Sequence, residues 1–298
     1  MGILSAKAGS IRHKNREEIG VRERGQRISG KSFAIGELDC KVVSNDWKNA
    51  EYKHLLVEAP ELGLAALAGQ FFHIACPSAG EVPAPYLRRP MSIYRVNRAR
   101  GCLEFLYKVS GTGTRALAAM EPGANLNIFG PLGKGFKLPD GCRHVLILAR
   151  GVGLATMAPL TELAISQGAR VTAILSVRSP ALEMASDYLK EAGAETIVVD
   201  DESGSSEIRR VESLIREIHA LTPFDYVSTC GSNRQLLLLQ ALADEFGFAG
   251  QVALEQHMGC GIGMCFCCVR EIKGPERIEY RRVCVEGPVF DLREAISW

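Results

Sequence analysis

Short apolar segments alternate with polar ones from about Lys31 to Leu138. The segments are rich in β-branched and aromatic residues, and glycine, proline, asparagine or aspartate separates them. This pattern is typical of short strands, and strands at this spacing predict an antiparallel barrel. The expected strands are Phe33–Val42, Tyr52–Glu58, Gly69–Cys76, Met91–Val96, Leu103–Val109 and Asn125–Phe129.

From His144 onward the pattern changes to short apolar runs that alternate with longer segments of helical period. Gly168 and Gly193 stand where helix C-caps belong. Strands and helices that alternate in this way predict a doubly wound parallel sheet. The expected strands are His144–Ala149, Arg170–Val177, Glu195–Val199 and Asp225–Cys230, and the expected helices span about 154–167, 180–192, 208–220 and 233–246.

The last fifty residues return to short strands around a group of cysteines. The fold class expected is therefore α+β and multidomain, which suits a length of 298 residues. The expected parts are a flexible N-terminal extension (1–30), a β-barrel (31–138), an α/β domain (139–250) and a small β-rich domain (251–298).

The net charge and the hydropathy pattern limit the kinds of partner that the chain is expected to bind. The net charge of +1 argues against nucleic acid or a membrane surface as the main ligand. The longest apolar run, Val145 to Ile165, includes Arg150, Pro159 and Glu162, so a buried strand, a turn and a helix explain it better than a membrane span. Residues 1–30 are polar and contain no apolar signal segment, which predicts a basic tail, or alternatively an assembly helix, on a cytoplasmic protein.

Four cysteines near the C-terminus follow the spacing C-x4-C-x2-C, with a fourth after fifteen further residues: Cys260, Cys265, Cys268 and Cys284. This is the spacing of plant-type ferredoxin loops, and four thiolates are what a [2Fe–2S] cluster requires. Gly261 and Gly263 permit the positive φ that a loop needs to turn several sulfurs toward one point. A zinc site stays open as an alternative, although zinc ligands usually come as two short pairs. Disulfides are disfavoured because cytosolic thiols stay reduced.

The remaining cysteines are assigned to other roles. Cys267 stands between two expected ligands and is expected to point away from the cluster, unless the ligand set slips by one residue. Four others fall in or beside apolar stretches and are expected to be core thiols: Cys40, Cys76, Cys102 and Cys142. His257 is expected to be a surface or packing residue, since four cysteines suffice as ligands.

One motif in the predicted barrel suits a pyrophosphate and a flat heterocycle. Arg89, Pro90 and Ser92 combine a cation, a rigid residue and a hydroxyl at the start of a strand. An arginine on a strand can pair with pyrophosphate, and Ser92 can hydrogen-bond the edge of a flat heterocycle. A solvated arginine is the plain alternative.

A second motif in the barrel suits phosphate. Tyr107 and Lys108 end a strand, and Gly113 and Thr114 follow in a glycine turn that opens a helix. The amides at such a helix start can bind phosphate, while a threonine-capped turn is the structural alternative. The later turn over residues 130–136 is expected to be structural.

The α/β region carries a candidate dinucleotide turn. Gly151 and Gly153 follow a buried strand and open a helix, the context that a pyrophosphate site needs. Arg178 follows the second strand, where an acidic residue favours NAD and an arginine favours a 2′-phosphate. NADP(H) therefore stays open, as does a merely solvated arginine. Cys230 ends the fourth strand, where ligands gather in such sheets.

Together these motifs resemble one family, the ferredoxin-reductase-like electron-transfer subunit of the B-type, two-flavin dihydroorotate dehydrogenases. The resemblance covers about residues 31–292 and is most specific at Leu254–Val269, closed by Arg282–Phe290. Plant-type ferredoxin domains place the fourth cysteine further along, so the shorter gap favours the dehydrogenase-subunit family. The chain departs from the family at Ala149-Arg150, where a glycine pair is expected, and in its N-terminal extension.

The resemblance implies FAD in the barrel, NAD(H) in the second domain and a [2Fe–2S] cluster in the third, while Arg178 keeps NADP(H) open. It implies that Arg89 binds the FAD pyrophosphate, Ser92 the flavin, and Gly113 and Thr114 the phosphates. Three residues would line the dinucleotide site: Gly151, Gly153 and Cys230.

The function expected is an electron relay between the dinucleotide, FAD, the cluster and a catalytic flavoprotein subunit, without a side chain acting as general acid or base. Two alternatives remain. One is a reductase subunit of another complex, linked to sulfide or ferredoxin. The other is a zinc-stabilised module without catalytic activity.

Overall fold

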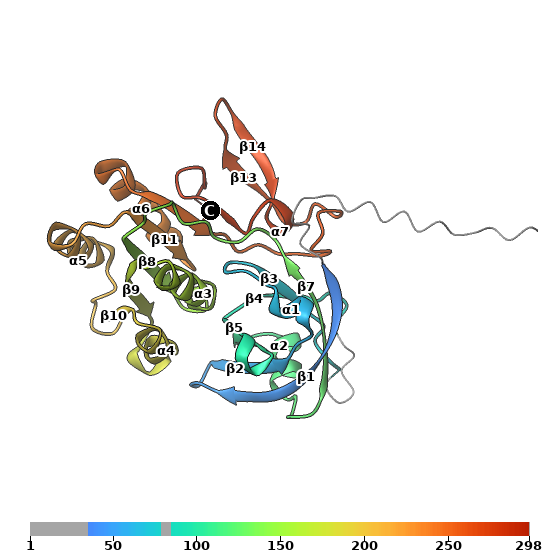
Figure 1. The fold of residues 1–298 in the computed structure, drawn as a ribbon. Helices are drawn as coiled ribbons and strands as arrows, with labels where there is room; N and C mark the ends of the chain where they lie inside the picture. Colours follow the sequence, from blue (N-terminus) through green and yellow to red (C-terminus); the bar gives the residue numbers. More distant parts are fainter. Residues whose placement is uncertain (1–34, 79–84, 298) are drawn as a thin grey trace, which may run out of the picture. The chain divides into compact units, whose positions relative to one another are not determined.

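The computed structural model describes residues 35–78 and 85–297 (Figure 1). The predicted N-terminal extension and the first residues of the strand predicted from residue 33 lie outside the described residues. Within the described ranges, no helix is long and apolar enough to cross a membrane.

The first half of the described chain forms a seven-stranded antiparallel sheet in the order β4-β3-β7-β1-β2-β6-β5. Leu38, Cys40 and Val42 on β1 are buried and the residues between them are exposed, as expected of a strand with one face on a core. In the described residues no ladder joins the edge strands β4 and β5, so the sheet is a half-barrel. The elements are β1 (Gly36–Trp47), β2 (Tyr52–Glu58), α1 (Glu61–Leu64), β3 (Phe71–Ile74), β4 (Arg89–Ser92), β5 (Arg95–Asn97), the 3-10 helix η1 (Arg98–Arg100), β6 (Cys102–Lys108), α2 (Thr112–Ala118) and β7 (Asn125–Leu132).

The cysteines predicted as core thiols lie in or against the cores. Cys40, Cys76 and Cys102 are buried, as predicted. Cys142 is only partly buried and packs against the core beneath α3.

The single strand predicted over Met91–Val96 is wrong. The chain forms β4, which pairs with β3 at one edge of the sheet, and then β5, which pairs with β6 at the other edge. Ile93 and Tyr94, between the two strands, are both buried. The apolar residues of this segment therefore belong in part to a buried crossing between two edges, which apolar content alone does not distinguish from a strand.

The second half forms a six-stranded sheet in the order β10-β9-β8-β11-β12-β15, parallel except for β15. Alternate residues of β8 pack on opposite faces: Val145 and Ile147 lie in a core with α3, and Leu146 and Leu148 in a core with α5 and α6. The predicted doubly wound sheet is thus present, with α3 on the face opposite α5 and α6 (Figure 1). The elements are β8 (His144–Arg150), α3 (Gly153–Ser166), β9 (Arg170–Val177), η2 (Pro180–Leu182), α4 (Ser186–Glu191), β10 (Glu195–Asp200), α5 (Ile208–Leu221), β11 (Tyr226–Cys230), α6 (Asn233–Phe246), β12 (Ala249–Ala253) and β15 (Val289–Asp291).

The helix predicted over residues 180–192 is wrong in its first half. The chain forms the short η2 and then α4, with Glu183 in an extended conformation between them. The Glu183 carboxylate accepts hydrogen bonds from the amides of Ala185 and Ser186, each at 2.6 Å. This side chain provides the start of α4 with an acceptor, so the helix begins there.

The C-terminal segment belongs partly to the parallel sheet. Strands β12 and β15 pair with each other as members of it, and the chain between them forms the hairpin β13 (Val269–Lys273) and β14 (Ile278–Arg282), followed by α7 (Val283–Glu286). The cysteine-rich loop leads from β12 into β13. The domain boundaries given above stay predictions.

Helix α6 offers a test of the packing. Leu239 is fully buried, whereas Leu237 on the same helix is 48% exposed. We expect Leu239→Ala to lower the free energy of unfolding by about 3 kcal/mol, and the matched control Leu237→Ala by less than about 0.5 kcal/mol. Chemical denaturation followed by far-UV circular dichroism measures both, and equal losses would contradict the packing of α6.

Candidate cofactor sites

A cavity of about 900 Å³ opens beside β4 and the end of β6. This volume lies at the upper end of the usual range for ligand pockets, about 300–1,000 Å³. A Cβ on Gly113 would lie 3.3 Å from Arg89 Nε, so the glycine leaves room for the guanidinium. The lining includes six residues predicted to bind a flavin nucleotide: Arg89, Pro90, Ser92, Tyr107, Lys108 and Thr114.

Two of these residues also hold the local structure. The Tyr107 hydroxyl donates to Asn45 Oδ1 at 2.9 Å, and the Asn45 amide donates to the Leu117 carbonyl at 2.9 Å, which ties β6 to α2. The Thr114 hydroxyl donates to the Gly111 carbonyl at 3.1 Å and accepts from the Gly111 amide at 3.0 Å. Thr114 is therefore a helix cap as well as a lining residue.

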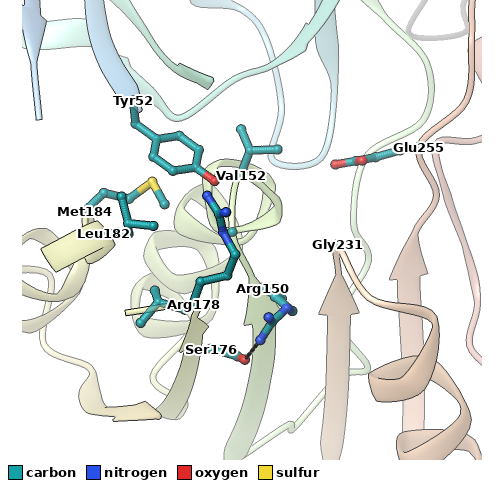
Figure 2. Close-up of a pocket in the computed structure, with 11 residues that line it drawn as sticks. Tyr52, Arg150, Val152, Ser176, Arg178, Leu182, Met184, Gly231 and Glu255 are labelled. Atoms are coloured by element: carbon teal, nitrogen blue, oxygen red, sulfur yellow. Dashed lines mark hydrogen bonds between the residues drawn. The ribbon is translucent and has the colours of Figure 1, made fainter. Parts of the chain in front are cut away.

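A second pocket, of about 220 Å³, lies at the carboxyl ends of the parallel strands (Figure 2). Gly151 after β8, Arg178 after β9 and Gly231 after β11 line it. Strands β8 and β11 are neighbours at the point where the strand order reverses, the usual ligand site of such sheets. Gly153 lies in the packing beside this pocket. A Cβ there would lie 2.6 Å from the Cys230 carbonyl oxygen, so only glycine lets the two turns pack together.

Both arginines in this pocket are paired with carboxylates. The Arg150 guanidinium donates to Ser176 Oγ at 2.7 Å and to the two carboxylate oxygens of Asp201 at 3.1 and 2.6 Å. These hydrogen bonds lower the pKa of Asp201. Arg178 donates to the Glu51 carboxylate, which comes from the turn between β1 and β2. Arg178 is therefore held by a partner and not merely solvated.

A line of four polar side chains connects the two cavities. Thr156 Oγ1 on α3 donates to Ser92 Oγ on β4 at 2.7 Å. The Cys230 thiol lies 3.8 Å from Thr156 Oγ1 and 4.0 Å from Glu255 Oε1. Burial raises the pKa of the Cys230 thiol, so it stays neutral. The Glu255 side chain is exposed where both cavities open, yet desolvation by the surrounding protein raises its pKa.

The segment that precedes and contains the cysteines forms one wall of the large cavity. Glu255, Gln256, His257 and Met258 line it, and so does Cys267. Cys267 is exposed and lies on this wall, which places it beside the candidate flavin cavity. His257, expected to be a surface or packing residue, also faces the cavity.

The four predicted cluster ligands form two pairs. The Cys260 sulfur accepts from the amides of Met264 at 3.3 Å and Cys265 at 3.4 Å, and the Cys268 sulfur accepts from the Cys284 amide at 3.4 Å. Desolvation acts to raise the pKa of Cys260, but the loop amides outweigh it and lower the pKa to about 7. Burial, followed by the contact with Cys268, raises the pKa of Cys284 to about 12. Among the described residues, no three histidine, cysteine or acidic side chains converge closely enough to hold a metal ion.

The backbone of the cysteine loop suits sulfur ligation. Gly261 and Gly263 have φ of +73° and +80°, and a Cβ on Gly261 would lie 2.9 Å from Leu132 and 3.0 Å from the His73 ring. Amides that point at a sulfur stabilise its thiolate form, which is the form that binds iron. The donor set, two glycines in the left-handed region and amides aimed at sulfur fit a [2Fe–2S] cluster.

Three apolar side chains around the cysteine loop are exposed: Ile262 at 46%, Met264 at 75% and Phe266 at 62%. The Phe266 ring contacts the Arg282 guanidinium at 5.2 Å. Cys265, among these residues, is also exposed, whereas Cys268 and Cys284 are buried. One end of the candidate cluster site therefore faces the surface of the chain through an apolar patch.

Sequence analysis missed several residues of these sites. Glu51 pairs with an arginine far away along the chain, and no local pattern signals such pairing. Glu255 stands five residues before Cys260, and this closeness to the cysteine motif is the one feature of the sequence that points to a role in the site. In the sequence, Arg150 stands out only as an interruption of the glycine turn.

Comparisons with known proteins agree with this arrangement. The family model for the iron-sulfur cluster binding domain of dihydroorotate dehydrogenase B matches residues 255–296. A chain from the structure of an NADH-dependent reduced ferredoxin-NADP oxidoreductase superposes with a TM-score of 0.73 at 24% identity, covering 86% of this chain and 88% of that one. A ferredoxin reductase of carbazole 1,9a-dioxygenase gives a TM-score of 0.55 at 20% identity, covering 71% and 65%. The fold is therefore ferredoxin-reductase-like.

Two relatives are electron transfer subunits of NAD(+)-dependent dihydroorotate dehydrogenase B. The protein from Desulforamulus reducens is 31% identical over 85% of this chain and 95% of its own length. The protein from Geobacillus thermodenitrificans is 36% identical over 76% of this chain and 86% of its own length. At this identity and coverage, the chain belongs to the family of dihydroorotate dehydrogenase B electron transfer subunits.

Proposed function

We propose that this chain carries electrons between a nicotinamide dinucleotide and the catalytic flavoprotein subunit of a dihydroorotate dehydrogenase, through its own FAD and [2Fe–2S] cluster. The observation that carries the proposal is the line Ser92–Thr156–Cys230–Glu255, which joins the two cavities. The cysteine segment forms a wall of the larger one. The three predicted sites are thus contiguous, as a relay requires. When bound, FAD supplies the step between two-electron hydride exchange and single-electron exchange with the cluster.

In this proposal the half-barrel side of the large cavity binds FAD. Arg89 supplies a cation for the pyrophosphate, and Gly113 leaves that guanidinium its space. Ser92 Oγ is held by Thr156, so its orientation toward a flavin edge is fixed. Pro90, Tyr107, Lys108 and Thr114 complete the lining. These contacts support an FAD domain over about residues 31–138.

The dinucleotide occupies the smaller pocket with its nicotinamide end toward Cys230 and Glu255. Both side chains lie where the two cavities approach each other. The neutral thiol and the hydroxyl of Thr156 place no charge against a nicotinamide ring. Gly151 and Gly153 form the turn next to the pyrophosphate. These features support a dinucleotide domain over about residues 139–250, to which β12 and β15 add strands.

The cluster lies within about residues 251–298, held by Cys260, Cys265, Cys268 and Cys284. Their two observed pairs and the loop amides support this ligand set. Reduced thiols are required, which suits the cytoplasm. The exposed patch of Ile262, Met264 and Phe266 is where we place the catalytic flavoprotein subunit, because an electron leaves a cluster most readily where the cluster lies nearest the surface.

The proposed function is tested with the full chain and its partner subunit produced together. We expect a brown complex that contains FAD, iron and labile sulfide and that reduces NAD⁺ with dihydroorotate. The chain expressed alone should pass electrons from NADH to an artificial acceptor. Zinc in place of iron would contradict the proposal, and iron and flavin without activity toward dihydroorotate would point to a reductase subunit of another complex.

The ligand set is tested at two neighbouring cysteines. We expect Cys265→Ser to lose most of the iron, the labile sulfide and the cluster's visible absorption while FAD stays bound, because a cluster with three thiolate ligands is less stable. The matched control Cys267→Ser should retain the iron. Metal analysis and electron paramagnetic resonance check both, and the reverse result would show that the ligand set is shifted by one residue.

The docking patch is tested at Phe266. We expect Phe266→Glu to weaken binding of the catalytic subunit by about tenfold or more, since a buried interface aromatic contributes roughly 2 kcal/mol. The control is Leu221→Glu, another exposed apolar residue, at the end of α5. Surface plasmon resonance measures both, with iron content determined for each variant. Unchanged binding by a Phe266→Glu protein that keeps its cluster would place the interface elsewhere.

A further inference from the structure

We propose that Glu51 is the residue that sets the preference of the dinucleotide pocket for NAD(H) over NADP(H). The proposal rests on the function proposed above, since it concerns the same pocket. It assigns the choice of cofactor to a carboxylate of the half-barrel and not to a residue of the dinucleotide-binding sheet.

Glu51 bridges two cations from different sheets. One carboxylate oxygen accepts from Arg178 Nη2 at the end of β9, and Oε2 lies 2.9 Å from Lys108 Nζ at the end of β6. The contact with Lys108 is ionic and not a well-aligned hydrogen bond. The contacts with Lys108 and Arg178 lower the pKa of Glu51, so the carboxylate stays charged.

The turn that carries Glu51 is itself held in place. Asn49 Oδ1 accepts from the amides of Glu51 at 3.0 Å and Tyr52 at 3.1 Å. The Asn49 side-chain amide donates to the Glu183 carbonyl, beyond β9, at 3.3 Å. Tyr52, the next residue, lines the pocket, and Figure 2 shows Arg178 reaching toward its ring. Glu51 is therefore fixed against Arg178 at the border of the pocket.

The place of this pair determines what it can recognise. In dinucleotide-binding sheets, the residue at the end of the second strand meets the adenosine ribose: a carboxylate accepts from the 2′-hydroxyl, and an arginine binds a 2′-phosphate. Here β9 is the second strand and Arg178 follows it. Sequence position alone therefore favours NADP(H). The structure supplies the missing carboxylate from 127 residues earlier in the chain.

Glu51 affects the binding of a 2′-phosphate and of a 2′-hydroxyl in opposite ways. A 2′-phosphate would have to take Arg178 from Glu51, and two negative groups would then compete for one guanidinium. A 2′-hydroxyl, in contrast, can donate to Oε1 and leave the ion pair intact, while Oε2 stays buried against Lys108. The other arginine in the pocket lining, Arg150, is held by Ser176 and Asp201, so the lining offers a 2′-phosphate no unpaired arginine.

The test compares four full-length variants: Glu51→Gln, Arg178→Gln, the double variant, and Glu245→Gln as control. Glu245 forms an ion pair with Arg216 between α6 and α5, outside both cavities. Isothermal titration calorimetry with NAD⁺ and NADP⁺ measures binding without turnover. Because Glu51 and Arg178 are partly exposed, an effect of about fivefold is expected.

We expect Glu51→Gln to shift the ratio of the two dissociation constants about fivefold toward NADP⁺, mainly by tighter NADP⁺ binding. Removing Arg178 in the same chain should abolish that gain, and Glu245→Gln should leave the ratio unchanged. An unchanged ratio in Glu51→Gln, or a gain that persists without Arg178, would overturn the inference. A wild-type chain that binds neither dinucleotide would instead contradict the proposed function itself.

Discussion

The hydrogen bond between Thr156 and Ser92 is the contact on which the arrangement of the sites depends. It joins the first turns of α3 to β4, the strand that carries Arg89. Thr156 can approach because Gly153, one turn earlier, lets α3 begin against the backbone of Cys230. The close packing of two turns in one sheet thus determines where β4, in the other sheet, lies. A side chain at Gly153 would separate the two cavities as well as the two turns.

The parts of the fold that sequence analysis predicted well are those with strong local signals. Helix α6 matches its predicted range because its N-cap, the Ser232 side chain, and the glycine after its last residue mark both ends. Strand β9 matches as well, since a buried parallel strand is a nearly continuous apolar run. The predictions for residues 91–96 and 180–192 were wrong because the chain changes direction within each segment. The residue pattern does not show that change. Buried crossings and side-chain caps such as Glu183 depend on tertiary contacts, which a window of sequence does not contain.

The same division holds for the candidate sites. Residues near a glycine turn or within the cysteine motif can be proposed from the sequence, because spacing alone suggests their chemistry. The charged partners were not, since Glu51 and Arg178 belong to different sheets and meet only after folding. Considered alone, Arg178 suggests a phosphate site. Its ion pair with Glu51 argues against a phosphate at this position. A strand-end arginine is therefore informative about cofactor choice only when its ionic partner is known.

The cysteine loop combines two opposite environments. Cys268 and Cys284 are buried, while Cys265 lies at the surface among exposed apolar side chains. Phe266 adopts a φ of +57°, which costs a non-glycine residue about 1 kcal/mol. Arg282 offsets that cost: its guanidinium contacts the Phe266 ring and donates to the Gly263 carbonyl and the Glu286 carboxylate. A strained, exposed aromatic residue brings no advantage to an isolated chain, since burial would stabilise it more. Its presentation beside a candidate cluster ligand is the arrangement expected of a surface that another subunit covers.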